Sequence, residues 1–157
     1  MPGYFLDTSA FAKLYHKEAG SDFVERIVTF PGSAVVSRLS LVEIESVFAI
    51  KIRTGQLDLT GQDLARRRLR ADISQGRLRV APPIEERHYQ RARQLLIRHG
   101  ATMALRTLDA IQLAVALDLL QTGAISAMVA ADQRLCQVAE VAGCPTLNPD
   151  GPGVFTP

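Results

Sequence analysis

Four acidic residues lie where a buried strand is expected to end or a helix to begin: Asp7, Glu43, Asp109 and Asp132. Each has a structural explanation when taken alone, because the helix macrodipole favours an acid in the first turn by ~0.3–1 kcal/mol. Asp7 and Asp109 fit that explanation less well, since they stand among apolar residues, where an unpaired carboxylate is costly. Four acids brought together repel one another unless a cation lies between them, and histidine-free oxygen ligands suit Mg²⁺ or Mn²⁺.

Two nearby acids help to define this set. Asp118 follows Asp109 by nine residues, and at ~100° per residue the two side chains lie on opposite faces of one helix. Glu45 is ~200° away from Glu43, so only one of that pair faces the same site. Periodicity does not select between them, but the position close to the helix start favours Glu43. A capping-box pattern with Ser40 is the structural alternative for Glu43.

Short apolar segments that alternate with helical patterns must position these acids. Strands are expected at residues 3–6, 34–37 and 127–131, as parallel neighbours, with weaker strands at 78–80 and 146–147. Helices are expected at residues 10–16, 21–29, 40–53, 60–75, 84–99, 107–121 and 132–142. This alternation predicts an α/β fold with a mostly parallel sheet. Ligands bind at the carboxyl ends of parallel strands, so the four acids are expected to meet at one rim.

The composition is that of one ordinary globular domain. The chain has 157 residues, of which 47% are apolar and 22% charged, which excludes a disordered or collagen-like protein. We expect a domain over residues 1–147 and a Pro/Gly-rich tail over 148–157. The sequence has no signal-peptide pattern and no membrane-length apolar run, which predicts a cytoplasmic protein without membrane contact. Cys136 and Cys144 have no zinc-site spacing and are expected to be buried thiols.

The charge is distributed unevenly along the chain. Residues 51–106 carry 13 basic and 5 acidic side chains, whereas residues 1–50 and 107–157 are both net acidic. Such asymmetry indicates either an anionic partner or solvated helix faces rich in arginine. Within the run of arginines that starts at Arg66, helical spacing places Arg66 and Arg70 on one side. These two arginines are the candidates for RNA binding.

The acids occur in motifs that resemble those of a known family. The motifs are LDTSA at 6–10, SLVEIES at 40–46, RTLDAIQLA at 106–114 and ADQRL at 131–135. Their order and spacing resemble the PIN-domain family, and most closely the VapC-type toxin ribonucleases of toxin–antitoxin pairs. The resemblance covers residues 4–147. It implies a three-layer α/β/α fold, a homodimer, a cognate antitoxin partner and an RNA substrate.

The resemblance also implies an activity and a site. The activity is endoribonuclease cleavage that depends on Mg²⁺ or Mn²⁺, and the metal ligands and catalytic acids are Asp7, Glu43, Asp109 and Asp132. The family commonly has Thr or Ser two residues before the fourth acid, where this chain has Ala130. Ser9 is the candidate for a hydroxyl near the metal in its place, although it also suits helix capping.

Two other function classes stay open at this point. The first is another Mg²⁺-dependent phosphoryl-transfer enzyme, although a phosphatase of the haloacid-dehalogenase type would have an acid where Ser9 stands. The second is a catalytically inactive nucleic-acid-binding protein, which is compatible with Ala130. Four acids without a cation would destabilise such a protein, which argues against the second class.

Overall fold

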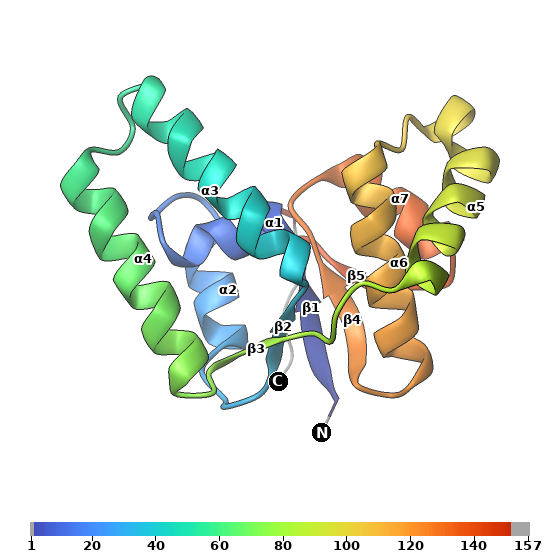
Figure 1. The fold of residues 1–157 in the computed structure, drawn as a ribbon, viewed down its shortest axis with the longest axis horizontal. Helices are drawn as coiled ribbons and strands as arrows, with labels where there is room; N and C mark the ends of the chain where they lie inside the picture. Colours follow the sequence, from blue (N-terminus) through green and yellow to red (C-terminus); the bar gives the residue numbers. More distant parts are fainter. Residues whose placement is uncertain (1, 152–157) are drawn as a thin grey trace.

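A five-stranded parallel sheet forms the centre of the computed structural model, which describes residues 2–151 (Figure 1). The strands are β1 (Gly3–Leu6), β2 (Ala34–Val36), β3 (Leu78–Val80), β4 (Ile125–Val129) and β5 (Thr146–Leu147). Their order across the sheet is β3-β2-β1-β4-β5, and every pairing is parallel. In the central strand, Phe5 is in register with Val35 on one side and Met128 on the other. The α/β class and the predicted parallel neighbours are confirmed.

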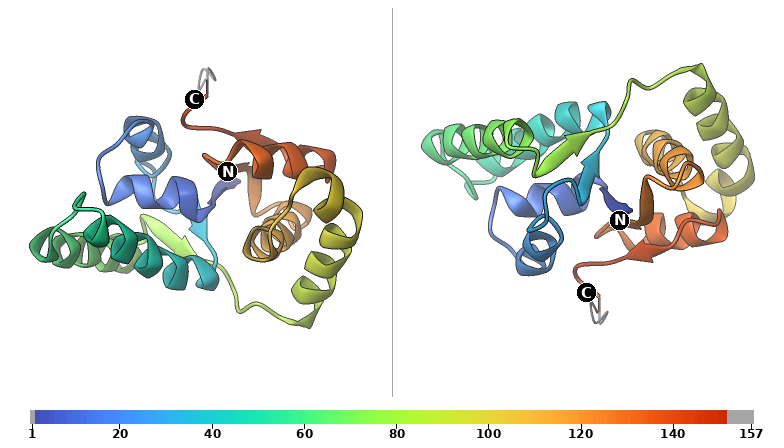
Figure 2. Two further views of the ribbon diagram at one scale, coloured as in Figure 1. Left: turned by 90° about the horizontal axis from the view of Figure 1, so that it is seen from above. Right: turned by 90° about the horizontal axis from the view of Figure 1, so that it is seen from below.

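Helices cover both faces of the sheet. They are α1 (Thr8–Phe11), which continues as the 3₁₀ helix η1 (Ala12–Leu14), α2 (Ser21–Ile27), α3 (Arg38–Arg53), α4 (Leu59–Ser74), α5 (Glu86–Met103), α6 (Thr107–Gln121) and α7 (Gln133–Val141). One face packs against helices α1 to α4 and the other against α5 to α7, as the views from above and below also show (Figure 2). This arrangement confirms the predicted three layers.

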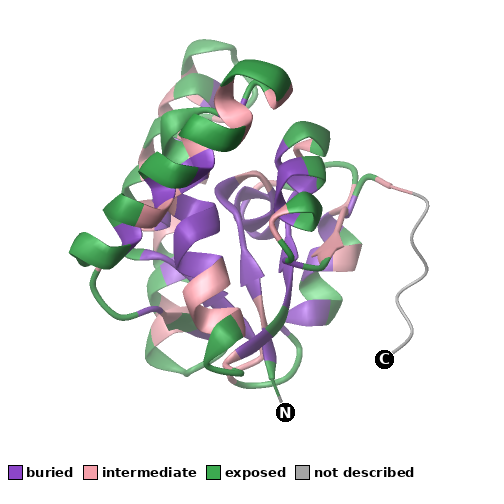
Figure 3. Cartoon of the chain, turned by 90° about the vertical axis from the view of Figure 1, so that its right-hand side faces the viewer, coloured by how far each residue is buried: buried purple, intermediate pink, exposed green. Residues whose placement is uncertain are grey.

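Alternation along β1 explains why there are two cores. Phe5 points into the core with α5, α6 and α7, whereas Leu6 points into the core with the first four helices. Both side chains are fully buried. Helix α6 is apolar almost all round because it lies within the molecule, and Figure 3 shows how burial concentrates on the sheet and on the inner faces of the helices. The carboxyl end of β1 is therefore fixed from both sides.

Several predicted boundaries are wrong. Strand β4 spans residues 125–129, not 127–131, so Ala130 lies beyond its end. Helix α4 begins at Leu59 after the cap Asp58, not at residue 60. Helix α5 does not stop before Gly100 but runs on to Met103, and Ala104 ends it with a φ of 52°. A glycine inside a helix costs only about 1 kcal/mol relative to alanine, which the packing of α5 on α6 outweighs.

Three further features concern the rest of the chain. Cys136 and Cys144 are buried free thiols, as predicted. No helix within residues 2–151 is long and apolar enough to cross a membrane. Of the predicted tail, Asp150 forms an ion pair with the buried Lys13, and residues 152–157 lie outside the described part of the chain.

Candidate active site

Asp7 stands at the carboxyl end of the central strand. Because β1 ends at Leu6, Asp7 becomes the N-cap of α1, and its side chain is only 5% exposed. Its Oδ2 accepts hydrogen bonds from the backbone N–H of Ser9 (3.1 Å) and from Ser9 Oγ (2.6 Å). The cap is therefore Asp7 and not Ser9, which corrects the expectation that Ser9 caps this helix. Both bonds converge on Oδ2, so Oδ1 stays available to a ligand.

Glu43 reaches the same end of the sheet from α3. Its Oε1 accepts hydrogen bonds from Thr8 Oγ1 (3.1 Å) and Gln112 Nε2 (2.5 Å). The predicted capping box with Ser40 is wrong, because α3 begins at Arg38 and Ser37 is its cap, accepting from the Ser40 N–H (3.0 Å). Both serines carry the hydroxyl that a cap requires, so the sequence alone did not separate them. The shift places Glu43 in the second turn of the helix.

Gln112 is a site residue that the sequence reasoning missed. It is fully buried on α6, where Nε2 donates to Glu43 Oε1 and to Ser40 Oγ (3.0 Å) and Oε1 accepts from Ser37 Oγ (2.7 Å). A buried amide without partners is unfavourable, so these bonds fix the position of Glu43. The sequence signal that could have revealed Gln112 is an amide within an otherwise apolar helix, one turn after Asp109.

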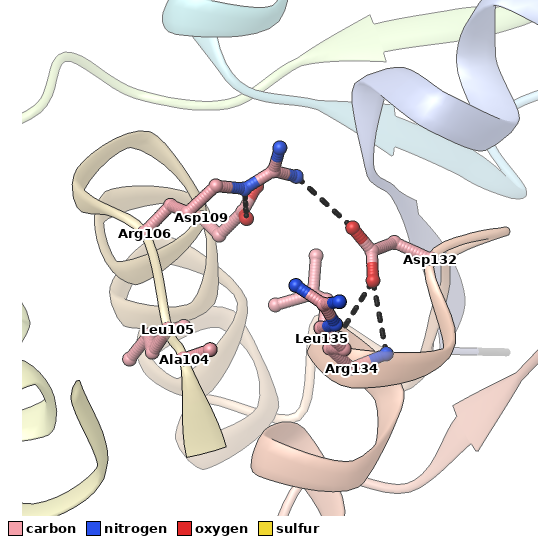
Figure 4. Close-up of a pocket in the computed structure, with 7 residues that line it drawn as sticks. All are labelled: Ala104, Leu105, Arg106, Asp109, Asp132, Arg134 and Leu135. Atoms are coloured by element: carbon pink, nitrogen blue, oxygen red, sulfur yellow. Dashed lines mark hydrogen bonds and ion pairs between the residues drawn. The ribbon is translucent and has the colours of Figure 1, made fainter. Parts of the chain in front are cut away.

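Asp109 and Asp132 face each other across a small pocket, and Arg106 lies between them (Figure 4). Arg106 Nε donates to Asp109 Oδ2 (2.9 Å) and Arg106 Nη2 to Asp132 Oδ2 (3.0 Å). Asp132 also caps α7, because Oδ1 accepts from the backbone N–H groups of Arg134 and Leu135. The pocket has a volume of about 90 Å³. A cation thus already connects two of the four predicted acids.

Burial and like charge raise the pKa values of the two central acids. Desolvation raises the pKa of Asp7 to about 6 against the hydrogen bonds from Ser9, and the nearby charges of Asp109 and Glu43 add to the rise. Desolvation also raises the pKa of Asp109, with a smaller contribution from Asp132, although Arg106 opposes it. These charge interactions link Asp7 with Glu43 and Asp109, and Asp109 with Asp132, so the four acids lie near one another at the carboxyl end of the sheet.

The side chains are close but do not form a closed metal cage. In the described part of the chain, no three histidine, cysteine or acidic side chains are positioned to hold a metal ion together. Glu43 is held by Thr8 and Gln112, and Arg106 occupies the space between Asp109 and Asp132. The donor set still fits a hard divalent cation, because it is oxygen-only and because the acid pair already binds a guanidinium.

The alternative acids lie elsewhere. Glu45 binds Arg66 with both carboxylate oxygens and so leaves the rim to Glu43. Asp118 pairs with Arg87 and His88 on the opposite face of α6, as the helical spacing predicted.

Ser9 and Ala130 lie next to Asp7. Besides donating to Asp7, the Ser9 hydroxyl accepts from the backbone N–H of Ala131 (3.0 Å), so it ties the end of β1 to the segment after β4. Ala130 is fully buried, and its N–H donates to Leu147 O (3.0 Å). The Ser9 hydroxyl thus lies 2.6 Å from the Asp7 carboxylate, whereas Ala130 has no hydroxyl to contribute.

Comparison with known proteins adds a family and a fold. A family model described as the PIN domain matches residues 4–141. No curated protein matches the sequence at a significant level. Among solved structures, a toxin–antitoxin complex from Klebsiella pneumoniae is similar at 18% identity, with 94% of this chain and 98% of that chain covered and a TM-score of 0.58. The protein PAE2754 from Pyrobaculum aerophilum is similar at 16% identity, with 92% and 83% covered and a TM-score of 0.55.

Proposed function

The chain belongs to the PIN domain family, and from that premise we propose that it is a metal-dependent endoribonuclease and the toxin of a toxin–antitoxin pair. PIN domains are typically nucleases and generally metal-dependent. The observation that carries the proposal is the pair Asp7 and Asp109, two acids of raised pKa beside each other at the carboxyl end of β1. The two carboxylates repel each other in the metal-free site, and a hard divalent cation would remove that repulsion.

Each acid has a defined part in this proposal. Asp7 and Asp109 would hold Mg²⁺ or Mn²⁺ directly, while Glu43 and Asp132 would bind it directly or through water. The bound cation supplies a water of lowered pKa and charge compensation at the phosphodiester. Gln112 keeps the Glu43 carboxylate aimed at the rim through its 2.5 Å hydrogen bond. Ser9 holds Asp7 in place, with its hydroxyl beside the same carboxylate.

Arg106 should compete with the cation in this site. Its guanidinium binds Asp109 and Asp132, and its side chain is 71% exposed, so it can leave without breaking the core. Arg106→Gln removes the competing positive charge, and we expect the protein to bind Mn²⁺ several-fold more tightly by isothermal titration calorimetry. Arg134→Gln, in the same pocket but without an ion pair among residues 2–151, is the control. An unchanged Mn²⁺ affinity in Arg106→Gln would contradict the competition.

The proposed partners are RNA, an antitoxin and a second copy of the chain. The similar complex from Klebsiella pneumoniae supports the antitoxin, because its fold is shared over 94% of this chain. An acidic rim attracts basic side chains, so we expect a basic or apolar segment of the antitoxin to cover the acids. The homodimer follows only from the family resemblance.

Growth of the host cell tests the toxin proposal. Expression of the wild-type chain without a partner should slow growth, and the Asp7→Asn variant, expressed to the same level, should not. The variant keeps the side-chain size and loses the charge that holds the cation. Equal growth of the two strains would contradict the toxin role.

A further inference from the structure

A second pocket lies in the groove between α5 and α7, away from the acids. Its volume is about 330 Å³, within the range of pockets that hold a small ligand. Its lining contains three basic side chains, one amide, four apolar residues and no acid: Arg91, Gln94, Leu95, Arg98, His99, Leu117, Val141 and Ala142. This mixture of basic and apolar lining suits a ligand that is both anionic and partly apolar.

The charges at this pocket are not compensated within the described chain. Among residues 2–151, neither Arg91 nor Arg98 forms an ion pair with an acid, and the same holds for His99. Helix α5 is therefore a source of positive charge that is free for a partner.

Three of the four arginines of α4 have partners within the described chain. Arg66 binds Glu45 with two nitrogens, and Arg67 binds Asp63 (2.7 Å). The guanidinium of Arg68 lies 5.9 Å from the centre of the Tyr15 ring. Arg66 and Arg70 remain proposed RNA contacts, but Arg66 must first leave Glu45. Within residues 51–106, α5 thus carries three arginines without an ion pair in the described part of the chain: Arg91, Arg93 and Arg98.

The basic pocket and the acidic pocket lie at opposite ends of α7. Arg134 and Leu135, at the start of α7, line the acidic pocket, whereas Val141 lies at the far end of the same helix and lines the basic pocket. Six residues of helix separate Leu135 from Val141, or about 9 Å along the axis. Helices α5 and α7 contact each other. Ala104, just after α5, lines the acidic pocket (Figure 4). A short stretch of single-stranded RNA spans that separation.

We propose that the α5–α7 groove is a nucleotide-binding subsite that holds the RNA strand beside the bond to be cleaved. Arg91 and Arg98 bind backbone phosphates, because guanidinium groups match phosphate oxygens in pairs. The apolar lining residues contact a base or ribose, while the positive charge follows the backbone, as in other grooves that bind single strands. The proposal rests on the proposed ribonuclease function and assigns a second part of the substrate to this chain.

The test measures the affinity for a fluorescently labelled single-stranded RNA by anisotropy, in EDTA so that no cleavage occurs, at several salt concentrations. Arg91→Ala/Arg98→Ala should weaken binding about ten-fold and lower the salt slope by about 1.4, the value for two phosphates on a single strand. Arg93→Ala is the matched control on the same helix, because it lies ~200° from Arg91 and should leave binding unchanged. Arg66→Ala/Arg70→Ala removes the same charge from α4 and should have the smaller effect.

Each other outcome overturns the subsite. The proposal fails if Arg91→Ala/Arg98→Ala binds RNA as the wild type does, or if Arg66→Ala/Arg70→Ala or Arg93→Ala weakens binding as much. A change in sedimentation with unaltered RNA affinity would assign the groove to self-association, and lost antitoxin binding alone would assign it to the antitoxin. Metal-dependent RNA cleavage by the wild type distinguishes failure of the subsite from failure of the proposed function. If the wild type cleaves RNA, only the subsite proposal fails. If the wild type neither binds nor cleaves RNA, the proposed function fails.

Discussion

Asp7→Asn and Asp109→Asn should each lower the rate of RNA cleavage by orders of magnitude while the fold survives. Asparagine keeps the size of the side chain, and at position 7 it can still accept the Ser9 N–H bond that caps α1. It lacks the negative charge that holds a divalent cation. The measurement is the initial cleavage rate of a labelled RNA in Mg²⁺, with circular dichroism and a melting curve to show that each variant is folded.

Asp118→Asn is the control for this prediction. Asp118 lies on the same helix as Asp109 but pairs with Arg87 and His88 on the other face. Its loss should leave the cleavage rate close to that of the wild type. A variant at Asp118 as inactive as the one at Asp109 would mean that the site is misplaced.

Asp7→Asn should also stabilise the metal-free protein at pH 7, by about 2–3 kcal/mol. Burial raises the pKa of Asp7 from 3.8 to about 6, and each unit of difference between folded and unfolded states corresponds to ~1.4 kcal/mol. Between pH 3.8 and about pH 6, the folded state binds more protons than the unfolded state. Its free energy of unfolding therefore falls as the pH rises from about 4 to about 6, and the loss persists above 6. The asparagine variant has no such loss.

Urea denaturation in EDTA checks this prediction at pH 4 and pH 7. The difference in unfolding free energy between the variant and the wild type should grow in favour of the variant over that range. Added Mn²⁺ should stabilise the wild type, because the cation binds the folded state, and should have little effect on the variant. A difference that is the same at both pH values would show that Asp7 is not the titrating group.

The position of the acids was predictable because it depends on local rules. Because β1 ends at Leu6, Asp7 lies at the carboxyl edge of a parallel sheet. An acid in the first turn of α6 lies at the same edge. The positions of Glu43 and Glu45 depend on contacts that the sequence does not reveal. Gln112 donates a hydrogen bond to Glu43 at the rim, whereas Glu45 forms an ion pair with Arg66.

The features that were missed depend on contacts between distant segments. Arg106 is three residues from Asp109, but its bond to Asp132 requires that the starts of α6 and α7 meet. The choice of Ser37 over Ser40 as the cap of α3 is coupled to the bond from Ser37 Oγ to Gln112, 75 positions away in the chain. Local propensity treats the two serines alike, so only the tertiary structure distinguishes them.

The central claim is that the acidic rim at the end of β1 cleaves RNA with the help of a divalent cation. The direct measurement is cleavage of a defined RNA by the purified, antitoxin-free wild-type protein, first in EDTA and then in a titration with Mg²⁺ or Mn²⁺. We predict no cleavage in EDTA and a rate that rises with cation concentration to saturation. Cleavage that persists unchanged in EDTA would contradict the claim.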